Sequence, residues 1–192
     1  FEEKAQSELF ENRPPRVLLV TFTRALTNAS RQLLLHLLGD DFQDYVRVDT
    51  LDGIAREIFA KAGHAESPIM GKWMVDDIKE TLERYIAQDD IKEPHKEILK
   101  SMQAEYLADE FEWVIDGREI PNLETYLSES RSGRGTRFDK ETRTAVWSFY
   151  SHWSAYIADK GETTFTKIQS VAKVAAGELP EDDTFYIVLV DE

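Results

Sequence analysis

The sequence predicts an α/β fold in which a parallel sheet is interrupted by a large helical block. Residues 17–20 and 185–190 are apolar runs without alternation, which is typical of strands covered on both faces. A helical pattern follows the first run with almost no loop, and this is the geometry of a βα unit. Helical periodicity then dominates residues 67–177, before the second apolar run.

The first third of the chain predicts two βα units in succession. Residues 17–20 form the first strand, and apolar residues recur at spacings of three and four through residues 25–38. Gly39 is a natural end for that helix. Residues 45–48 alternate like a short strand, and a second helical pattern covers residues 51–62. Both strands are therefore expected to lie parallel in one sheet.

Residues 67–177 form the predicted helical block, in which we expect no strand. Because the lone strand at residues 185–190 needs partners, the block is predicted to be inserted between two strands of one sheet. The expected domains are residues 1–66 with 178–192, and residues 67–177. An aromatic stripe at helical spacing predicts core packing rather than a surface that stacks on bases. The tryptophans of this stripe are Trp73, Trp113, Trp147 and Trp153.

Composition limits the partners that the chain can have. A formal net charge of −14 makes the surface repel nucleic acid, so any DNA contact requires a local groove of basic and polar groups. The absence of cysteine excludes disulfides and thiolate metal sites. No stretch approaches the roughly 18 apolar residues that span a bilayer. We therefore expect a soluble, cytoplasmic protein without a membrane partner.

Polar residues follow each predicted strand, and in open α/β sheets ligands bind beyond these carboxyl ends. An apolar strand followed by Asp-Glu is the Walker B pattern of P-loop nucleotide hydrolases, in which the Asp holds Mg²⁺ and the Glu polarises the attacking water. Structural roles are also open, because acidic residues commonly begin solvated loops and Thr50 or Asp52 can be a helix N-cap. The strand-end residues are Thr21, Phe22, Thr23, Thr50, Asp52, Asp191 and Glu192.

A basic, glycine-rich segment at residues 130–137 is a second candidate for DNA contact. Glycine lets a backbone approach a phosphate closely, and Arg131, Arg134 and Arg137 supply fork-shaped donors. The alternative is a surface loop whose arginines pair with neighbouring helices. The chain contains no Walker A sequence, since Gly71-Lys72 is followed by Trp73, and the four histidines lack the spacing of metal ligands.

Three segments resemble motifs of the UvrD/Rep-like superfamily 1 DNA helicases. Residues 17–26, Val-Leu-Leu-Val-Thr-Phe-Thr-Arg-Ala-Leu, resemble motif Ia, a strand followed by Thr-Phe-Thr-Asn-Lys-Ala-Ala. Residues 48–52, Val-Asp-Thr-Leu-Asp, resemble the next motif, usually Thr-Phe-His-Ser. Residues 187–192, Ile-Val-Leu-Val-Asp-Glu, resemble the start of motif II, Asp-Glu-Ala-Gln-Asp after a strand. The order of the segments and the helical insertion also agree with this family.

The resemblance implies part of a RecA-like P-loop sheet with an inserted accessory subdomain. It implies ATP and Mg²⁺ as cofactors, with Asp191 as the metal ligand and Glu192 as the general base. Single-stranded DNA, or its junction with duplex, would follow the other strand ends and the basic segment. The residues implied to contact it are Thr21, Phe22, Thr23, Arg24, Thr50, Asp52, Arg131, Arg134 and Arg137.

Two departures from the family motifs change the expected chemistry. Arg24-Ala25 replaces Asn-Lys in the first motif, and Leu51-Asp52-Gly53 replaces Phe-His-Ser in the second. An aspartate in place of histidine repels a phosphate unless a cation lies between them.

The expected function is that of a fragment of an ATP-dependent DNA translocase or helicase. The Walker A loop is expected upstream, so the fragment alone should be inactive as an ATPase. One alternative is a P-loop kinase or nucleotide-binding regulator with a helical lid. The other is a helical protein-interaction module in which the strands serve as scaffold.

Overall fold

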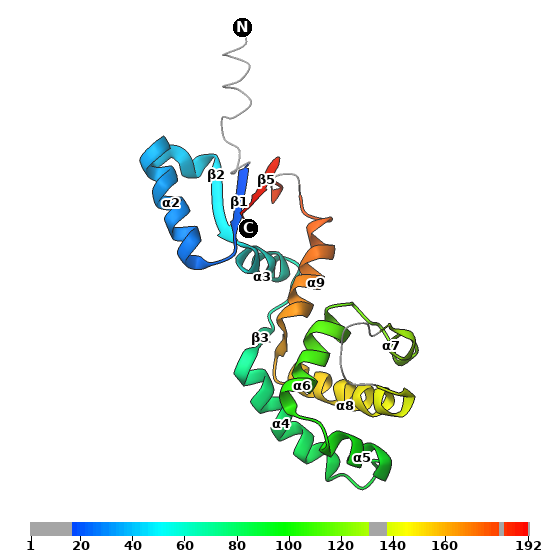
Figure 1. Cartoon of the computed structure of the whole chain (residues 1–192). Helices are drawn as coiled ribbons and strands as arrows, with labels where there is room; N and C mark the ends of the chain where they lie inside the picture. The colour runs from blue at the N-terminus through cyan, green and yellow to red at the C-terminus, as the bar shows by residue number, and fades with distance from the viewer. Residues whose placement is uncertain (1–16, 131–137, 181–182, 192) are drawn as a thin grey trace. The chain divides into compact units, whose positions relative to one another are not determined.

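The computed structural model describes residues 17–130, 138–180 and 183–191 (Figure 1). These residues form a mixed α/β structure with a three-stranded and a two-stranded sheet. The chain divides into two compact units, residues 1–63 with 172–192 and residues 64–171. The boundaries expected from the sequence, after residues 66 and 177, lie three and six residues further along the chain. In the described part of the chain, no helix has both the length and the apolar character needed to cross a membrane.

The first unit contains a parallel sheet in the order β2-β1-β5 (Figure 1). Its strands are β1 (Val17–Thr21), β2 (Val46–Thr50) and β5 (Ile187–Val190). The registers place Val20 beside Asp49 on one side and beside Val190 on the other. The mixed α/β fold with a parallel sheet is therefore confirmed. Because all three strands are parallel, their carboxyl ends meet at one edge of the sheet.

Each of the first two strands runs directly into a helix. After β1 the chain forms α2 (Arg24–Leu38), and after β2 it forms α3 (Leu51–Lys61). Thr23 caps α2 by accepting from Leu26 N at 3.2 Å, and Thr50 caps α3 by accepting from Gly53 N at 3.0 Å. A short 3₁₀ helix, η1 (Asp40–Asp44), connects α2 to β2. Threonine hydroxyls thus satisfy amides that helix starts leave unpaired.

The expectation that the final strand is covered on both faces is wrong for this chain. Leu18 and Val20 in β1 are buried, but every residue of β5 is exposed, and Val190 reaches 70%. β5 lies at the end of the sheet order and pairs with β1 on one side. An apolar run indicates that a strand would be stable in a buried environment. It does not indicate which elements cover that strand.

The second unit is mainly helical, with a small parallel sheet that the sequence did not predict. β3 (Ser67–Ile69) pairs with β4 (Glu162–Thr164), so the expectation of no strand in residues 67–177 is wrong. Both strands have three residues, too few to produce a period-2 pattern. The helices of this unit are α4 (Gly71–Ile86), α5 (Glu93–Lys100), α6 (Ala104–Asp109), the π-helix η2 (Glu110–Asp116), α7 (Leu123–Ser128) and α8 (Lys140–Asp159). The last helix, α9 (Phe165–Ala176), begins in this unit and ends in the first one.

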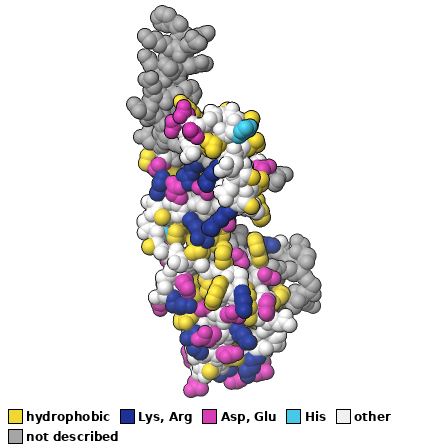
Figure 2. Space-filling view, turned by 90° about the vertical axis from the view of Figure 1, so that its left-hand side faces the viewer, with side chains coloured by type: hydrophobic (Ala, Val, Ile, Leu, Met, Phe, Trp, Pro, Cys, Tyr) yellow, Lys and Arg dark blue, Asp and Glu magenta, His cyan; other side chains and the backbone are white. Residues whose placement is uncertain are grey.

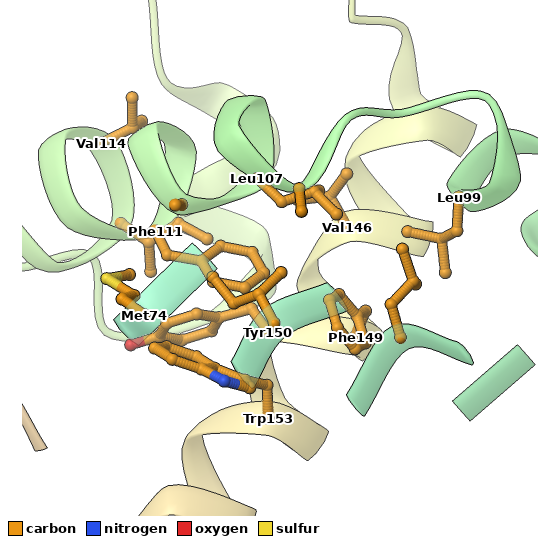
Figure 3. Packing of buried hydrophobic residues seen from close by; sticks show 14 of the residues in the cluster. Met74, Leu99, Leu107, Phe111, Val114, Val146, Phe149, Tyr150 and Trp153 are labelled. Atoms are coloured by element: carbon orange, nitrogen blue, oxygen red, sulfur yellow. The ribbon is translucent and has the colours of Figure 1, made fainter. Parts of the chain in front are cut away.

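Aromatic side chains form the centre of the second unit (Figure 3). The Phe111 ring centroid lies 5.8 Å from that of Phe149 and 5.2 Å from that of Trp153. Trp153 is fully buried, and its Nε1 donates to Asp77 Oδ1 at 2.7 Å. The prediction of core packing is right for Trp153 but wrong for Trp73 and Trp113, which are 79% and 63% exposed.

Candidate nucleic-acid interface at the sheet edge

Strand ends that are far apart in the sequence lie at the same edge of the sheet. Thr21 is in register with Thr50 at the ends of β1 and β2. On the other side of β1, Asp191 N donates to Val20 O at 2.9 Å, so Asp191 continues the ladder directly after β5. Thr23, one residue before α2, belongs to the same edge. The sheet therefore gathers the three segments that resemble family motifs.

A groove of about 360 Å³ opens at this edge, between the first turns of α2 and α3. We call it the edge groove. Its volume lies at the small end of the range for ligand sites, about 300 to 1,000 Å³. Figure 2 views the molecule from the side on which Figure 1 draws α2, where dark blue Lys and Arg side chains lie among magenta acidic and yellow hydrophobic ones. The groove is lined by Phe22, Arg24, Thr27, Asn28, Arg31, Asp49, Thr50, Asp52, Gly53 and Arg56.

Three arginines line the edge groove, although the chain as a whole is strongly acidic. Arg24 and Arg31 come from α2, and Arg56 comes from α3. The Arg31 guanidinium is held at the sheet, because its Nε and Nη2 both donate to Val48 O, Nε over 3.2 Å. The lining thus carries three guanidinium groups against the two carboxylates of Asp49 and Asp52, a local excess of positive charge that favours an anionic ligand.

Sequence reasoning missed Asn28, Arg31 and Arg56 as groove residues. The signal was present in the helical spacing, since Arg24, Asn28 and Arg31 recur at intervals of four and three on one face of α2. Likewise, Asp52 and Arg56 are four residues apart on α3. Choosing between this face and the apolar face as the functional one required the position of each helix on the sheet.

Asp49 is held at the floor of the groove by its own partners. Its Oδ1 accepts from Thr50 N at 2.8 Å, and its Oδ2 accepts from Arg47 Nη2 at 2.9 Å. Gly53 leaves room for this carboxylate, because a Cβ at residue 53 would lie 2.5 Å from Asp49 Oδ1. The ion pair with Arg47 offsets part of the charge of Asp49, since Arg47 also pairs with Glu57.

Arg47 also connects β2 to α3. It forms an ion pair with Glu57, and Glu57 is 3.3 Å from Lys61 Nζ. The hydrogen bond to Glu57 raises the pKa of the Arg47 guanidinium, and the same contact lowers the pKa of Glu57. Lys61 continues the chain of charges to Asp183, 2.8 Å away, and this contact raises the pKa of Lys61.

The strand-end residues of the first segment have different environments. Phe22 is 88% exposed at the rim of the groove, while Thr21 is 1% exposed. The Thr21 hydroxyl shares a 2.6 Å hydrogen bond with the Thr27 hydroxyl, and Thr27 also donates to Thr23 O at 3.0 Å. Thr21 therefore holds the β1–α2 junction together, and its buried hydroxyl is not presented at the surface.

The acceptor groups for a metal ion at this edge are few. Asp191 is exposed at the carboxyl end of β5, and Glu192 lies outside the described residues. Within the described ranges, no group of three or more acidic or histidine side chains is arranged to hold a metal ion. A single carboxylate suits Mg²⁺ that takes its other ligands from nucleotide phosphates and water. Asp191 therefore fits the role of one ligand in such a site.

The basic segment expected to contact DNA also falls outside the described residues. Arg131, Arg134 and Arg137 all belong to it, and their expected roles stay predictions. Arg143 follows this segment and lies among the described residues. Its Nη1 donates to the carbonyl oxygens of Tyr126 at 2.6 Å and Glu129 at 2.9 Å.

Comparison with models of known protein families, and with curated proteins, found no match. The resemblance to the UvrD/Rep-like helicases therefore rests on the three segments themselves and on their order in the chain.

Proposed function

We propose that this chain is part of the first RecA-like motor domain of an ATP-dependent single-stranded DNA translocase or helicase. The single observation that carries the proposal is the common edge of β1, β2 and β5. The three segments that resemble motifs are separated in the sequence by as much as the whole second unit, yet they end at this edge. A motor needs this proximity, since nucleotide hydrolysis must change contacts with the polynucleotide.

The nucleotide side of the proposed site is the end of β5. Asp191 would bind Mg²⁺, and Glu192 would accept a proton from the water that attacks the γ-phosphate. Bound Mg²⁺ would offset the charge that develops on the phosphate oxygens. The phosphate-binding Walker A loop would come from outside these residues, and the helical second unit would be an accessory subdomain inserted before β5.

The DNA side of the proposed site is the edge groove. Arg24 and Thr50 would contact backbone phosphates, and the exposed ring of Phe22 would meet a base. Asp52 replaces the family's histidine, and a carboxylate there needs a nearby cation. The groove supplies such cations, because Arg31 and Arg56 line it together with Asp52.

The test of the nucleotide side is DNA-stimulated ATPase activity in a longer form of the protein that includes a Walker A loop. Asp191→Ala should abolish the ATPase activity. Glu192→Gln should lower the ATPase rate by a factor of about 10² to 10⁴, which is the usual contribution of a general base. Asp40→Asn, at an exposed residue of η1, is a matched control and should leave the ATPase activity unchanged. Activity retained in both edge variants would exclude the motor, as would Mg²⁺-dependent ATP hydrolysis by the 192-residue chain alone.

A further inference from the structure

Three side chains in the edge groove have no role in the family resemblance. Asn28 and Arg31 come from α2, and Arg56 comes from α3, so the groove receives basic and amide groups from two separate helices. An amide and guanidinium groups are typical donors to phosphate oxygens. Groups converging from two helices can reach one anion from different directions, which a row of charges along one helix cannot do.

The distribution of charge in the first unit favours an anion in this groove. Its described residues include six basic side chains, Arg24, Arg31, Arg47, Arg56, Lys61 and Lys173. Arg47 and Lys61 are committed to ion pairs with Asp49, Glu57 and Asp183. Arg24, Arg31 and Arg56 line the groove, together with the carboxylates of Asp49 and Asp52. Half of the basic residues of this acidic unit therefore surround one small cavity.

Arg31 is the best-positioned of these groups. Its Nε and Nη2 donate to Val48 O, which fixes the guanidinium against the middle of β2. A guanidinium carries five N–H donors in a rigid plane, so donors remain for a second acceptor. Because the side chain is already ordered, less conformational entropy is lost when a ligand binds.

We infer that Asn28, Arg31 and Arg56 form a subsite for one backbone phosphate of single-stranded DNA, beyond the positions that resemble family motifs. The inference rests on the proposed function, because it takes the polynucleotide as the ligand. The groove volume of about 360 Å³ suits a single nucleotide unit. Arg31 is the positioning donor of the subsite, and Arg56 supplies charge from the opposite helix.

The experiment measures binding of fluorescein-labelled oligothymidylate to the 192-residue chain by fluorescence anisotropy, over a series of KCl concentrations. Each phosphate contact that is lost should reduce the slope of log K against log[salt] by about 0.7 for a single strand. Arg31→Gln and Arg56→Gln should each produce this reduction. Lys173→Gln is the control, because Lys173 is an exposed residue of α9 that does not line the groove. This variant should leave the slope unchanged.

Arg31→Lys separates geometry from charge. The lysine keeps the positive charge, so the salt slope should stay at the wild-type value, but an ammonium cannot reproduce the planar fork. Affinity at fixed salt should therefore fall several-fold. Thermal unfolding of each variant checks that it is folded, and Arg56→Gln carries the test if Arg31→Gln fails to fold.

The outcomes distinguish this inference from the proposed function. If the wild-type chain binds and Arg24→Gln lowers the slope, while Arg31→Gln and Arg56→Gln leave it unchanged, the subsite is excluded and the proposed function stands. If the wild-type chain binds no oligothymidylate at low salt, the DNA side of the proposed function fails, and the subsite fails with it.

Discussion

Some single residues at the sheet edge have a structural role and also line the candidate site. The sequence allows Thr50 to be an N-cap, a ligand contact or both, and Thr50 is the N-cap of α3 while also lining the edge groove. Its hydroxyl accepts from Gly53 N, and a threonine oxygen has a second lone pair for another donor. Thr21 differs, because burial leaves its hydroxyl with only local partners.

Gly53 allows a direct test of the groove floor. Alanine is favoured over glycine inside helices by about 1 kcal/mol, so Gly53→Ala would normally stabilise α3. Here the added Cβ would meet Asp49 Oδ1 at 2.5 Å, and the carboxylate would have to leave Arg47 and Thr50 N. We expect Gly53→Ala to lower the free energy of unfolding, measured by urea denaturation.

The control is the same substitution without the carboxylate. In an Asp49→Ala background, Gly53→Ala should be neutral or stabilising, because the main clash is absent. Equal effects of Gly53→Ala in both backgrounds would mean that Asp49 is not the obstacle.

Among the secondary-structure elements, β2 and α3 are linked by the ion pair between Arg47 and Glu57. The hydrogen bond from Arg47 holds the pKa of Glu57 below the ordinary value of a glutamate. A carboxylate with a lowered pKa stabilises the folded state above that value, and the contribution is lost as pH falls through the folded pKa. Because Glu57 is partly exposed, solvent screening keeps the effect small.

The expected result is a difference in acid sensitivity. Between about pH 6 and about pH 3, the free energy of unfolding should fall further in the wild type than in Glu57→Gln, with the difference developing below pH 4.5. Denaturant titrations at several pH values measure it. Parallel pH profiles would show that the ion pair contributes nothing to stability.

The exposure of β5 leads to a prediction about how much each strand contributes to stability. Leu18 in β1 is buried and Leu189 in β5 is half-exposed, although the two strands pair directly. Leu18→Ala should lower the free energy of unfolding by about 2 to 5 kcal/mol, as for other buried leucines. Leu189→Ala should lower it by less than about 1 kcal/mol. Similar losses in both variants would indicate that β5 is covered in solution.

Across the chain, local sequence signals predict the positions of helices and strands better than they predict which residues are buried. The apolar run before Asp191 predicted a strand and its parallel pairing, because strand propensity is a property of the run itself. The exposure of that strand, and of Trp73, depends on which other segments pack against them. Periodicity cannot supply this information, since it describes one element at a time.

The candidate site was predictable at strand ends and not on helices. Parallel strands must end at one edge, so Thr50 and Asp191 could be placed together from topology alone. Arg31 and Arg56 lie one or more helical turns beyond the strand ends, and their convergence depends on how α2 and α3 lie on the sheet. That packing is a tertiary property, which no motif in the sequence encodes.

The most direct test of the central claim is nuclear magnetic resonance of the ¹⁵N-labelled chain titrated with oligothymidylate. If the shared edge of the sheet binds the strand, amide shifts should change first at Phe22, Arg24, Asn28, Thr50 and Gly53. The amide shifts of the described residues in the second unit, residues 64–171, should change less. Shift changes confined to residues 64–171, or no changes at all, would contradict the account.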